Sequence, residues 1–190
     1  MKRTGLLFLV NVLLLSLTAQ TRVDSLLNEL NGPDRDYVFV VAHRGDWRNA
    51  PENSIDAIER AIAMKADVVE IDIRPTKDGD FVLIHDETIE RTMTGKGNVS
   101  DYTVEELKNM LLKSGNGIRT HERIPTLKEA LLVTKDRILV NIDKGGSYIK
   151  EIIPIIHETG TENQVIIKGS YTVDKVLAQY GDKKGMLYMP

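Results

Sequence analysis

Glu70 and Asp72 are separated by one residue within the segment 68–74, in which apolar and charged residues alternate. Because successive side chains of a strand point to opposite faces, both carboxylates face the same side. Such hard oxygen ligands favour Mg²⁺ or Ca²⁺, with Mn²⁺ as a further option, over zinc or copper. Asp143, at the end of a later apolar run, is the predicted third ligand. A solvated pair without an ion is the alternative, but acids on a buried strand need a compensating charge.

His43 and His85 each follow an apolar run that ends at the histidine or just before it. Histidine exchanges protons near neutral pH, so two of them beside an acidic cluster predict an acid/base pair. A structural hydrogen-bonding histidine at a strand end is the alternative for each.

Arg44 and Lys168 bring positive charge to the same strand ends. Arginine has a forked donor set and lysine a point charge, and both suit a phosphate. The alternatives are a salt bridge from Arg44 to a neighbouring acid and a solvated strand end for Lys168.

Apolar runs and amphipathic helical patterns alternate along the chain, which predicts an α/β fold with a parallel sheet. In such folds the functional residues gather at the carboxyl ends of the strands, where these candidates stand. The Thr103/Glu106 and Thr126/Glu129 pairs have the spacing of capping boxes and predict helix starts. The predicted strands span 37–42, 68–74, 81–84, 138–142, 165–167 and 185–189, and the other predicted helices follow residue 54 and span 147–159 and 172–180.

Residues 1–19 combine a basic start with a short apolar run and a small-residue exit, which is typical of a signal peptide. We therefore expect export to the periplasm or the extracellular space, with an uncleaved anchor as the alternative. After cleavage no stable membrane span is expected. Residues 20–36 are predicted to be a linker with a short helix, and 37–190 the main domain. A polar, glycine-dotted segment at about 87–123 is predicted to be an insertion.

The composition excludes several kinds of site. The chain has no cysteine, so disulfides, thiolate metal sites and cysteine nucleophiles are absent. Loss of Lys2 and Arg3 with the leader would change the formal charge from −3 to −5, so no nucleic-acid partner is expected. The oligomeric state is not readable.

Seven short motifs occur in an order and spacing that resemble the glycerophosphodiester phosphodiesterase family, over about the middle half of the chain. No single motif is specific, but the ordered set is. The motifs are Ala42-His43-Arg44-Gly45, Pro51-Glu52-Asn53-Ser54, Glu70-Ile71-Asp72, Thr76-Lys77-Asp78-Gly79, His85-Asp86, Arg91-Thr92 and Ile124-Pro125-Thr126-Leu127.

This resemblance implies a (β/α)₈ TIM-type barrel that hydrolyses glycerophosphodiesters, such as deacylated phospholipids, to an alcohol and glycerol 3-phosphate. It implies one divalent cation on Glu70, Asp72 and an acid of a later strand, with His43 and His85 as the acid/base pair. Glu52 and Lys144 join Arg44 and Lys168 as expected substrate or phosphate contacts. The chain departs from the family pattern where Asp143 is followed directly by Lys144, since the family usually has glutamate and then lysine two residues later.

Only about five barrel strands are predicted, whereas a closed barrel needs eight. We therefore expect a barrel truncated after about five strands, with the insertion after the second. Two alternatives to the leading function stay open. One is an inactive fragment or phosphate-ester-binding module, and the other is a related phosphodiesterase acting on another lipid headgroup.

Overall fold

The structure, a computed structural model, describes residues 20–33, 36–180 and 187–190. The predicted signal peptide at 1–19 lies outside these residues, so it stays a prediction. Within the described residues, no helix has the length and apolar character needed to cross a bilayer.

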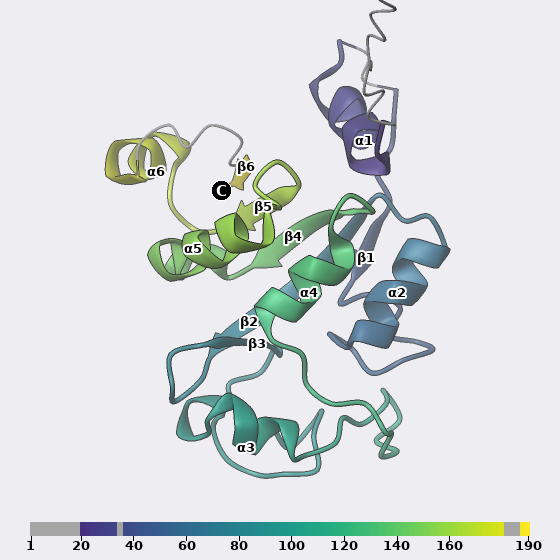
Figure 1. The fold of residues 1–190 in the computed structure, drawn as a ribbon, viewed down its shortest axis with the longest axis vertical. Coiled ribbons are helices and arrows are strands. Elements are labelled where there is room, and N and C mark those ends of the chain that lie inside the picture. The colour runs from purple at the N-terminus through teal and green to yellow at the C-terminus, as the bar shows by residue number, and fades with distance from the viewer. Residues whose placement is uncertain (1–19, 34–35, 181–186) are drawn as a thin grey trace, which may run out of the picture.

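Five parallel strands form one sheet in the order β1-β2-β4-β5-β6 (Figure 1), which confirms the predicted α/β fold with a parallel sheet. The register pairs His43 with Glu70 and Asp72 with Asp143, so the candidate residues meet at one edge. The short β3 runs antiparallel to the end of β2. The strands are β1 (Val41–His43), β2 (Val68–Pro75), β3 (Phe81–Leu83), β4 (Leu139–Asp143), β5 (Val165–Lys168) and β6 (Leu187–Met189).

Three helices, α2, α4 and α5, cover one face of the sheet (Figure 1). Ile58, Leu131 and Ile152, one from each helix, pack in the same cluster as Val69, Ile71 and Ile73 of β2. The odd-numbered residues of β2 therefore face the helices, and Glu70 and Asp72 face the other side. The helices are α1 (Arg22–Asn31), α2 (Ile55–Ala63), α3 (Val104–Lys108), α4 (Leu127–Thr134), α5 (Ile149–Thr159) and α6 (Val173–Tyr180), with 3₁₀ turns at Val99–Asp101 and Gly145–Ser147.

Local signals explain where several helices begin and end. Both predicted capping boxes form: Thr103 caps α3 and Thr126 caps α4, each with a glutamate that returns the bond. Gly160 ends α5 in the left-handed region, with φ 64°. Helix α1 lies at the opposite end of the sheet from the candidate site, because its Val23 and Leu26 pack against the first residues of β2 and β4.

The inserted segment at 87–123 has a small hydrophobic core of its own, and β3 divides its side chains between the two cores. Phe81 and Leu83 join the main cluster, whereas Val82 joins the second cluster with Met93 and Leu107. This division follows from the alternation of side chains along a strand. The insertion therefore packs against the face of β3 that carries Val82, opposite the face that contacts the main core.

The prediction of a first strand over 37–42 is wrong in its extent. Only Val41–His43 are in β1, and Val38 and Val40 are 81% and 60% exposed. Within the described residues β1 pairs with β2 alone, so one edge and the preceding segment have no neighbouring strand. An apolar run indicates that a segment favours burial. Whether the segment is buried depends on which other elements pack against it.

Candidate active site

Three carboxylates converge at the carboxyl edge of the sheet. Oxygens of Glu70, Asp72 and Asp143 lie within 4.8 Å of one another. Asp72 is 1% exposed and Glu70 8% exposed. Burial, followed by the negative charge of Asp72, raises the pKa of Glu70 to about 7. The structure brings the predicted ligand set together, and a buried all-oxygen donor set of this kind fits a hard divalent cation.

Arg44 connects the carboxylates to the loop after β1. Its backbone N–H donates to Glu70 Oε2 at 3.0 Å and its Nη1 donates to Glu52 Oε1 at 3.0 Å. Its Nε lies 3.2 Å from Asp72 Oδ2, but the geometry is not that of a hydrogen bond, which leaves this buried N–H without a partner within the described chain. Arg44 therefore forms the ion pairs with neighbouring acids that were the alternative to a phosphate contact, while its Nε–H makes no hydrogen bond.

Two lysines lie against the same acids. Lys144 Nζ is 3.1 Å from Asp72 Oδ1 and 3.2 Å from the carbonyl oxygen of His85. Lys168 Nζ is 2.8 Å from Asp143 Oδ1. Burial by itself raises the pKa of Asp143, but the contact with Lys168 and then the charge of Lys144 together more than offset it, and the pKa is lowered. Asp143, Lys144 and Lys168 line an open cleft of 330 Å³ at the ends of β4 and β5.

Asn53 is a site residue to which sequence reasoning assigned no role. It is 1% exposed, its Nδ2 donates to Asp72 Oδ2 at 3.0 Å, and its Oδ1 accepts the backbone N–H of Asp72 at 3.1 Å. The amide therefore fixes both the strand position and the carboxylate of Asp72. Asn53 is in the left-handed region, with φ 59°, a conformation in which asparagine is enriched.

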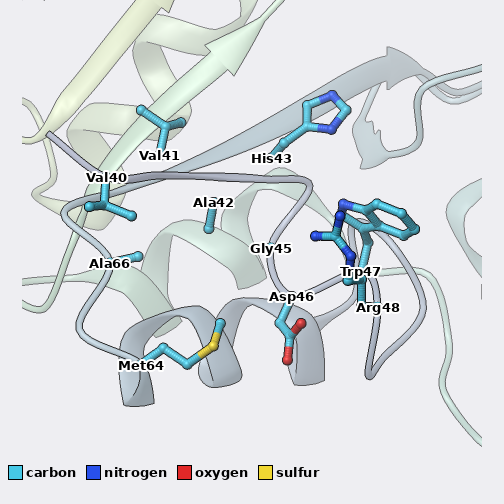
Figure 2. A pocket seen from close by; sticks show the side chains of 10 residues that line it. All are labelled: Val40, Val41, Ala42, His43, Gly45, Asp46, Trp47, Arg48, Met64 and Ala66. Carbon is cyan, nitrogen blue, oxygen red and sulfur yellow. The ribbon is translucent and has the colours of Figure 1, made fainter.

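His43 projects from the end of β1 and its side chain is 61% exposed. Its Nε2 lies 4.0 Å from Glu70 Oε2. Figure 2 shows His43 and Val41 on one side of the strand and Ala42 on the other, beside a groove of 320 Å³ that Trp47 and Met64 also line. The following Gly45 has φ 72°, and a Cβ there would stand 2.6 Å from the carbonyl carbon of Ala57, so a glycine is needed for the loop to approach α2.

His85 is held by its neighbour in sequence. Its Nδ1 lies 2.7 Å from Asp86 Oδ1. Asp86 in turn accepts from Arg91, whose hydrogen bond is the main cause of a lowered pKa for that carboxyl group. Because an ionised carboxylate is only an acceptor, a hydrogen bond between them requires the proton on Nδ1 of His85 and leaves Nε2 as the other ring nitrogen.

Arg91 and Glu52 extend this chain of contacts back to Arg44. The guanidinium of Arg91 donates to both oxygens of Glu52, at 2.7 and 2.8 Å. Burial by itself raises the pKa of Glu52, but Arg91 and then Arg44 more than offset it and the pKa is lowered. Glu52, expected to touch substrate, is thus engaged by two guanidinium groups. Asp86 and Arg91 were part of the recognised motifs but carried no predicted role.

Comparison with known proteins adds a family match and several relatives. Residues 43–169 match the model of the glycerophosphoryl diester phosphodiesterase family. The chain is 44% identical over 138 residues to a glycerophosphodiester phosphodiesterase of Caldanaerobacter subterraneus, which covers 68% of this chain and 56% of that protein. It is also 44% identical over 144 residues to a putative glycerophosphodiester phosphodiesterase of Bacillus subtilis, covering 75% of this chain and 57% of the relative. The chain thus spans little more than half the length of these relatives.

Solved structures show the same fold. A glycerophosphoryl diester phosphodiesterase from Parabacteroides distasonis superposes with a TM-score of 0.77 at 34% identity, over 87% of this chain and 58% of that one. An Oleispira antarctica phosphodiesterase, solved in complex with the product sn-glycerol-3-phosphate, superposes with a TM-score of 0.60 at 24% identity, over 80% and 64% of the two chains. The five parallel strands correspond to part of the TIM barrel of these neighbours, as predicted.

Proposed function

Because the chain belongs to the glycerophosphoryl diester phosphodiesterase family, we propose that it hydrolyses glycerophosphodiesters to an alcohol and glycerol 3-phosphate. The observation that carries this proposal is the convergence of three carboxylates at one sheet edge, with His43 Nε2 4.0 Å from Glu70 Oε2. The backbone carbonyl of His85 accepts from Lys144, which also contacts Asp72. The two histidines are the proposed acid/base pair.

Glu70, Asp72 and Asp143 are the residues that would hold a divalent cation, Mg²⁺ or Ca²⁺, in this proposal. Their donor atoms are all carboxylate oxygens, and burial together with the charge of Asp72 raises the pKa of Glu70. When bound, the cation would offset negative charge on the phosphoryl oxygens. Asn53 keeps Asp72 in the orientation that this ligand set requires.

Arg44 and Lys168 are the proposed phosphate contacts. Arg44 has a buried Nε without a hydrogen-bond partner in the described chain, so a phosphoryl oxygen would satisfy it. Lys168 is 48% exposed and lines the cleft beside Asp143, where its ammonium is accessible to an anion. Lys144 bridges Asp72 and the backbone of His85, which favours a positioning role for its side chain.

The histidines would move protons in two steps. In the first, one imidazole accepts the proton of the substrate's glycerol hydroxyl as that oxygen attacks phosphorus, and the other protonates the departing alcohol oxygen. In the second, the roles reverse while water opens the cyclic phosphate. His85 is prepared for this exchange because Asp86 holds its Nδ1–H and leaves Nε2 free.

We also propose that the protein is exported, on the strength of the leader pattern at residues 1–19. A phosphate-ester-binding module without turnover is the second candidate, because the cationic groups of Arg44 and Lys168 could bind a phosphate ester by themselves.

Release of glycerol 3-phosphate from a set of glycerophosphodiesters tests the function. The full chain is assayed with added Mg²⁺ or Ca²⁺, with chelator, and as His43→Ala and His85→Ala. His121→Ala, an exposed histidine of the insertion, is the matched control. We expect turnover to be lost in chelator and in both site variants but kept in the control. Turnover that persists in chelator would remove the cation from the mechanism, and saturable binding without turnover would favour the binding module.

A further inference from the structure

A second cleft, of 420 Å³, opens beside the site between the loop after β1 and the inserted segment. It is lined by Trp47, Glu52, Arg91, Thr92, Lys113 and the turn 114–117. We propose that this cleft binds the leaving alcohol of the phosphodiester, and that it selects a polyhydroxyl alcohol such as glycerol over a quaternary ammonium such as choline. This inference rests on the proposed function and deepens it.

Two lining residues connect the cleft to the surroundings of the two histidines. Trp47 lines it and also lines the groove beside His43. On the other side Arg91 lines it and contacts Asp86, the partner of His85. A phosphodiester whose reacting atoms lie between the histidines therefore has one substituent directed toward this cleft.

Thr92 supplies an independent sign of a ligand. It is 6% exposed, it lines the cleft, and its hydroxyl has no hydrogen-bond partner within the described residues. A buried hydroxyl without a partner costs free energy, and most such groups in folded proteins are satisfied. The carbonyl of Thr92 accepts the N–H of Lys113 at 2.8 Å, so the backbone that carries the hydroxyl is fixed. An alcohol hydroxyl, which both donates and accepts, is the complementary partner.

The charges of the cleft disfavour a cationic headgroup. Its carboxylate, Glu52, is already bonded to Arg44 and Arg91. Arg91 and Lys113 line the cleft as cations, and the ammonium of Lys113 uses one donor on the carbonyl of Glu90 at 2.6 Å. Lysine has three donors, so two stay available for hydroxyl groups of a ligand.

The aromatic content of the cleft argues in the same direction. Quaternary ammonium groups are bound by cages of several aromatic faces. Here Trp47 is the one aromatic lining residue. The guanidinium of Arg48 lies 4.6 Å from the centroid of its ring. Arg48 lines the groove beside His43, where Figure 2 shows the two side chains together. A choline group would meet a single aromatic ring and two cations.

Trp47 makes the proposal measurable, because it is the single tryptophan of the chain. Its fluorescence is titrated with glycerophosphoglycerol, glycerophosphocholine and glycerophosphomethanol, which differ only in the leaving alcohol. The titrations use the His85→Ala chain so that no diester is consumed. We expect glycerophosphoglycerol to bind about tenfold more tightly than the choline diester, the scale of one charge-assisted hydrogen bond.

Two variants and a control test whether the selectivity arises from residues of this cleft. Thr92→Val and Lys113→Met should each weaken glycerophosphoglycerol about tenfold and leave the methyl diester unchanged within about twofold. Lys96→Met, an exposed lysine of the same insertion outside the cleft, should change neither. The inference is overturned by choline binding as tightly as glycerol, or by variants that weaken all three diesters equally.

Steady-state rates on the same three diesters separate this inference from the proposed function. Turnover at equal kcat/KM for all headgroups would keep the function and overturn the inference. Selective binding detected by Trp47 fluorescence, without any turnover, would overturn the proposed function but support the proposed specificity of the cleft.

Discussion

The carboxyl edge of the sheet and the inserted segment place their functional groups by different means. At the sheet edge, parallel register sets Glu70, Asp72 and Asp143 to within 4.8 Å of one another. The insertion holds Arg91, Thr92 and Lys113 through turns, isolated bridges and a small core. Strand register is a rigid way to build an ion site, whereas a turn-built wall can vary its side chains without disturbing that site.

Two of the contacts between these regions bear on the site. The alternation of β3 shares its side chains between both hydrophobic cores. The Arg91–Glu52 pair then joins the insertion to the loop after β1, and through Arg44 to Asp72. Variants in each region, and at this pair, show how far the regions act independently.

The largest effect is expected from Glu70→Gln at the sheet edge. If Glu70 is a ligand as proposed, removing its charge should lower turnover on the order of 10³-fold, since a bound cation would supply several kcal/mol of transition-state stabilisation. The rise in melting temperature on adding Mg²⁺ or Ca²⁺ should also disappear. Glu151→Gln, an exposed carboxylate on α5, is the control. Unchanged ion-dependent stabilisation in Glu70→Gln would contradict the ligand assignment.

Truncating one buried leucine in each hydrophobic core tests whether the two regions unfold independently. Leu131 of the main core and Leu107 of the insertion core are both 0% exposed, and each change to alanine should cost about 2–5 kcal/mol. We expect Leu131→Ala to lower hydrogen-exchange protection across the sheet, and Leu107→Ala to lower it mainly within 87–123. Equal loss in both regions from either variant would show a single cooperative unit.

Arg91→Met breaks the connection between the regions. It removes the guanidinium that contacts Asp86 and leaves Glu52 with that of Arg44 alone, so we expect a loss of about 1–3 kcal/mol in unfolding free energy and of about 10–100-fold in kcat. Arg137→Met is a matched control, because Arg137 makes the same two-bonded contact with Glu59 on the surface. The control should cost at most about 1 kcal/mol and leave kcat unchanged. Equal effects of the two variants on kcat would deny Arg91 a role in positioning His85.

Much of the fold was predictable because its signals are local. Capping boxes mark the starts of α3 and α4, and alternation in β2 shows that Glu70 and Asp72 share a face. The meeting of these acids with Asp143 follows from parallel pairing. Such features depend on neighbours in sequence or on one general rule of sheets.

Other features were not predictable, because they depend on contacts between distant residues. The bonds of Asn53 to Asp72 and of Arg91 to Glu52 join side chains 19 and 39 residues apart. Nothing in the local pattern around Asn53 or Arg91 specifies those partners. The first strand was predicted too long for a related reason: its apolar run does not reveal that a covering strand is lacking among the described residues.

The dependence of unfolding free energy on pH tests the environment of Glu70 at the sheet edge. The pKa of Glu70 is raised to about 7 in the folded chain, above its ordinary value of roughly 4.3. The folded state therefore holds an extra proton between these values, and this contribution is full below about pH 4 and lost as pH rises through 7. In chelator, unfolding free energy should fall by about 1 kcal/mol from pH 6 to 8. The fall should be absent in Glu70→Gln; if the slope persists there, another group causes it.

The smallest predicted effect is the difference in unfolding free energy between removing a buried hydroxyl in the cleft and removing one elsewhere in the protein. Thr134, 1% exposed, donates its hydroxyl to the carbonyls of Ala130 and Leu131, so Thr134→Val should cost about 1–2 kcal/mol. The hydroxyl of Thr92 has no partner in the described chain, so Thr92→Val should leave unfolding free energy unchanged or slightly higher. Chemical denaturation of both variants measures the difference. A protein keeps an unpaired buried hydroxyl at some cost, and equal destabilisation by the two changes would show that the fold already satisfies Thr92.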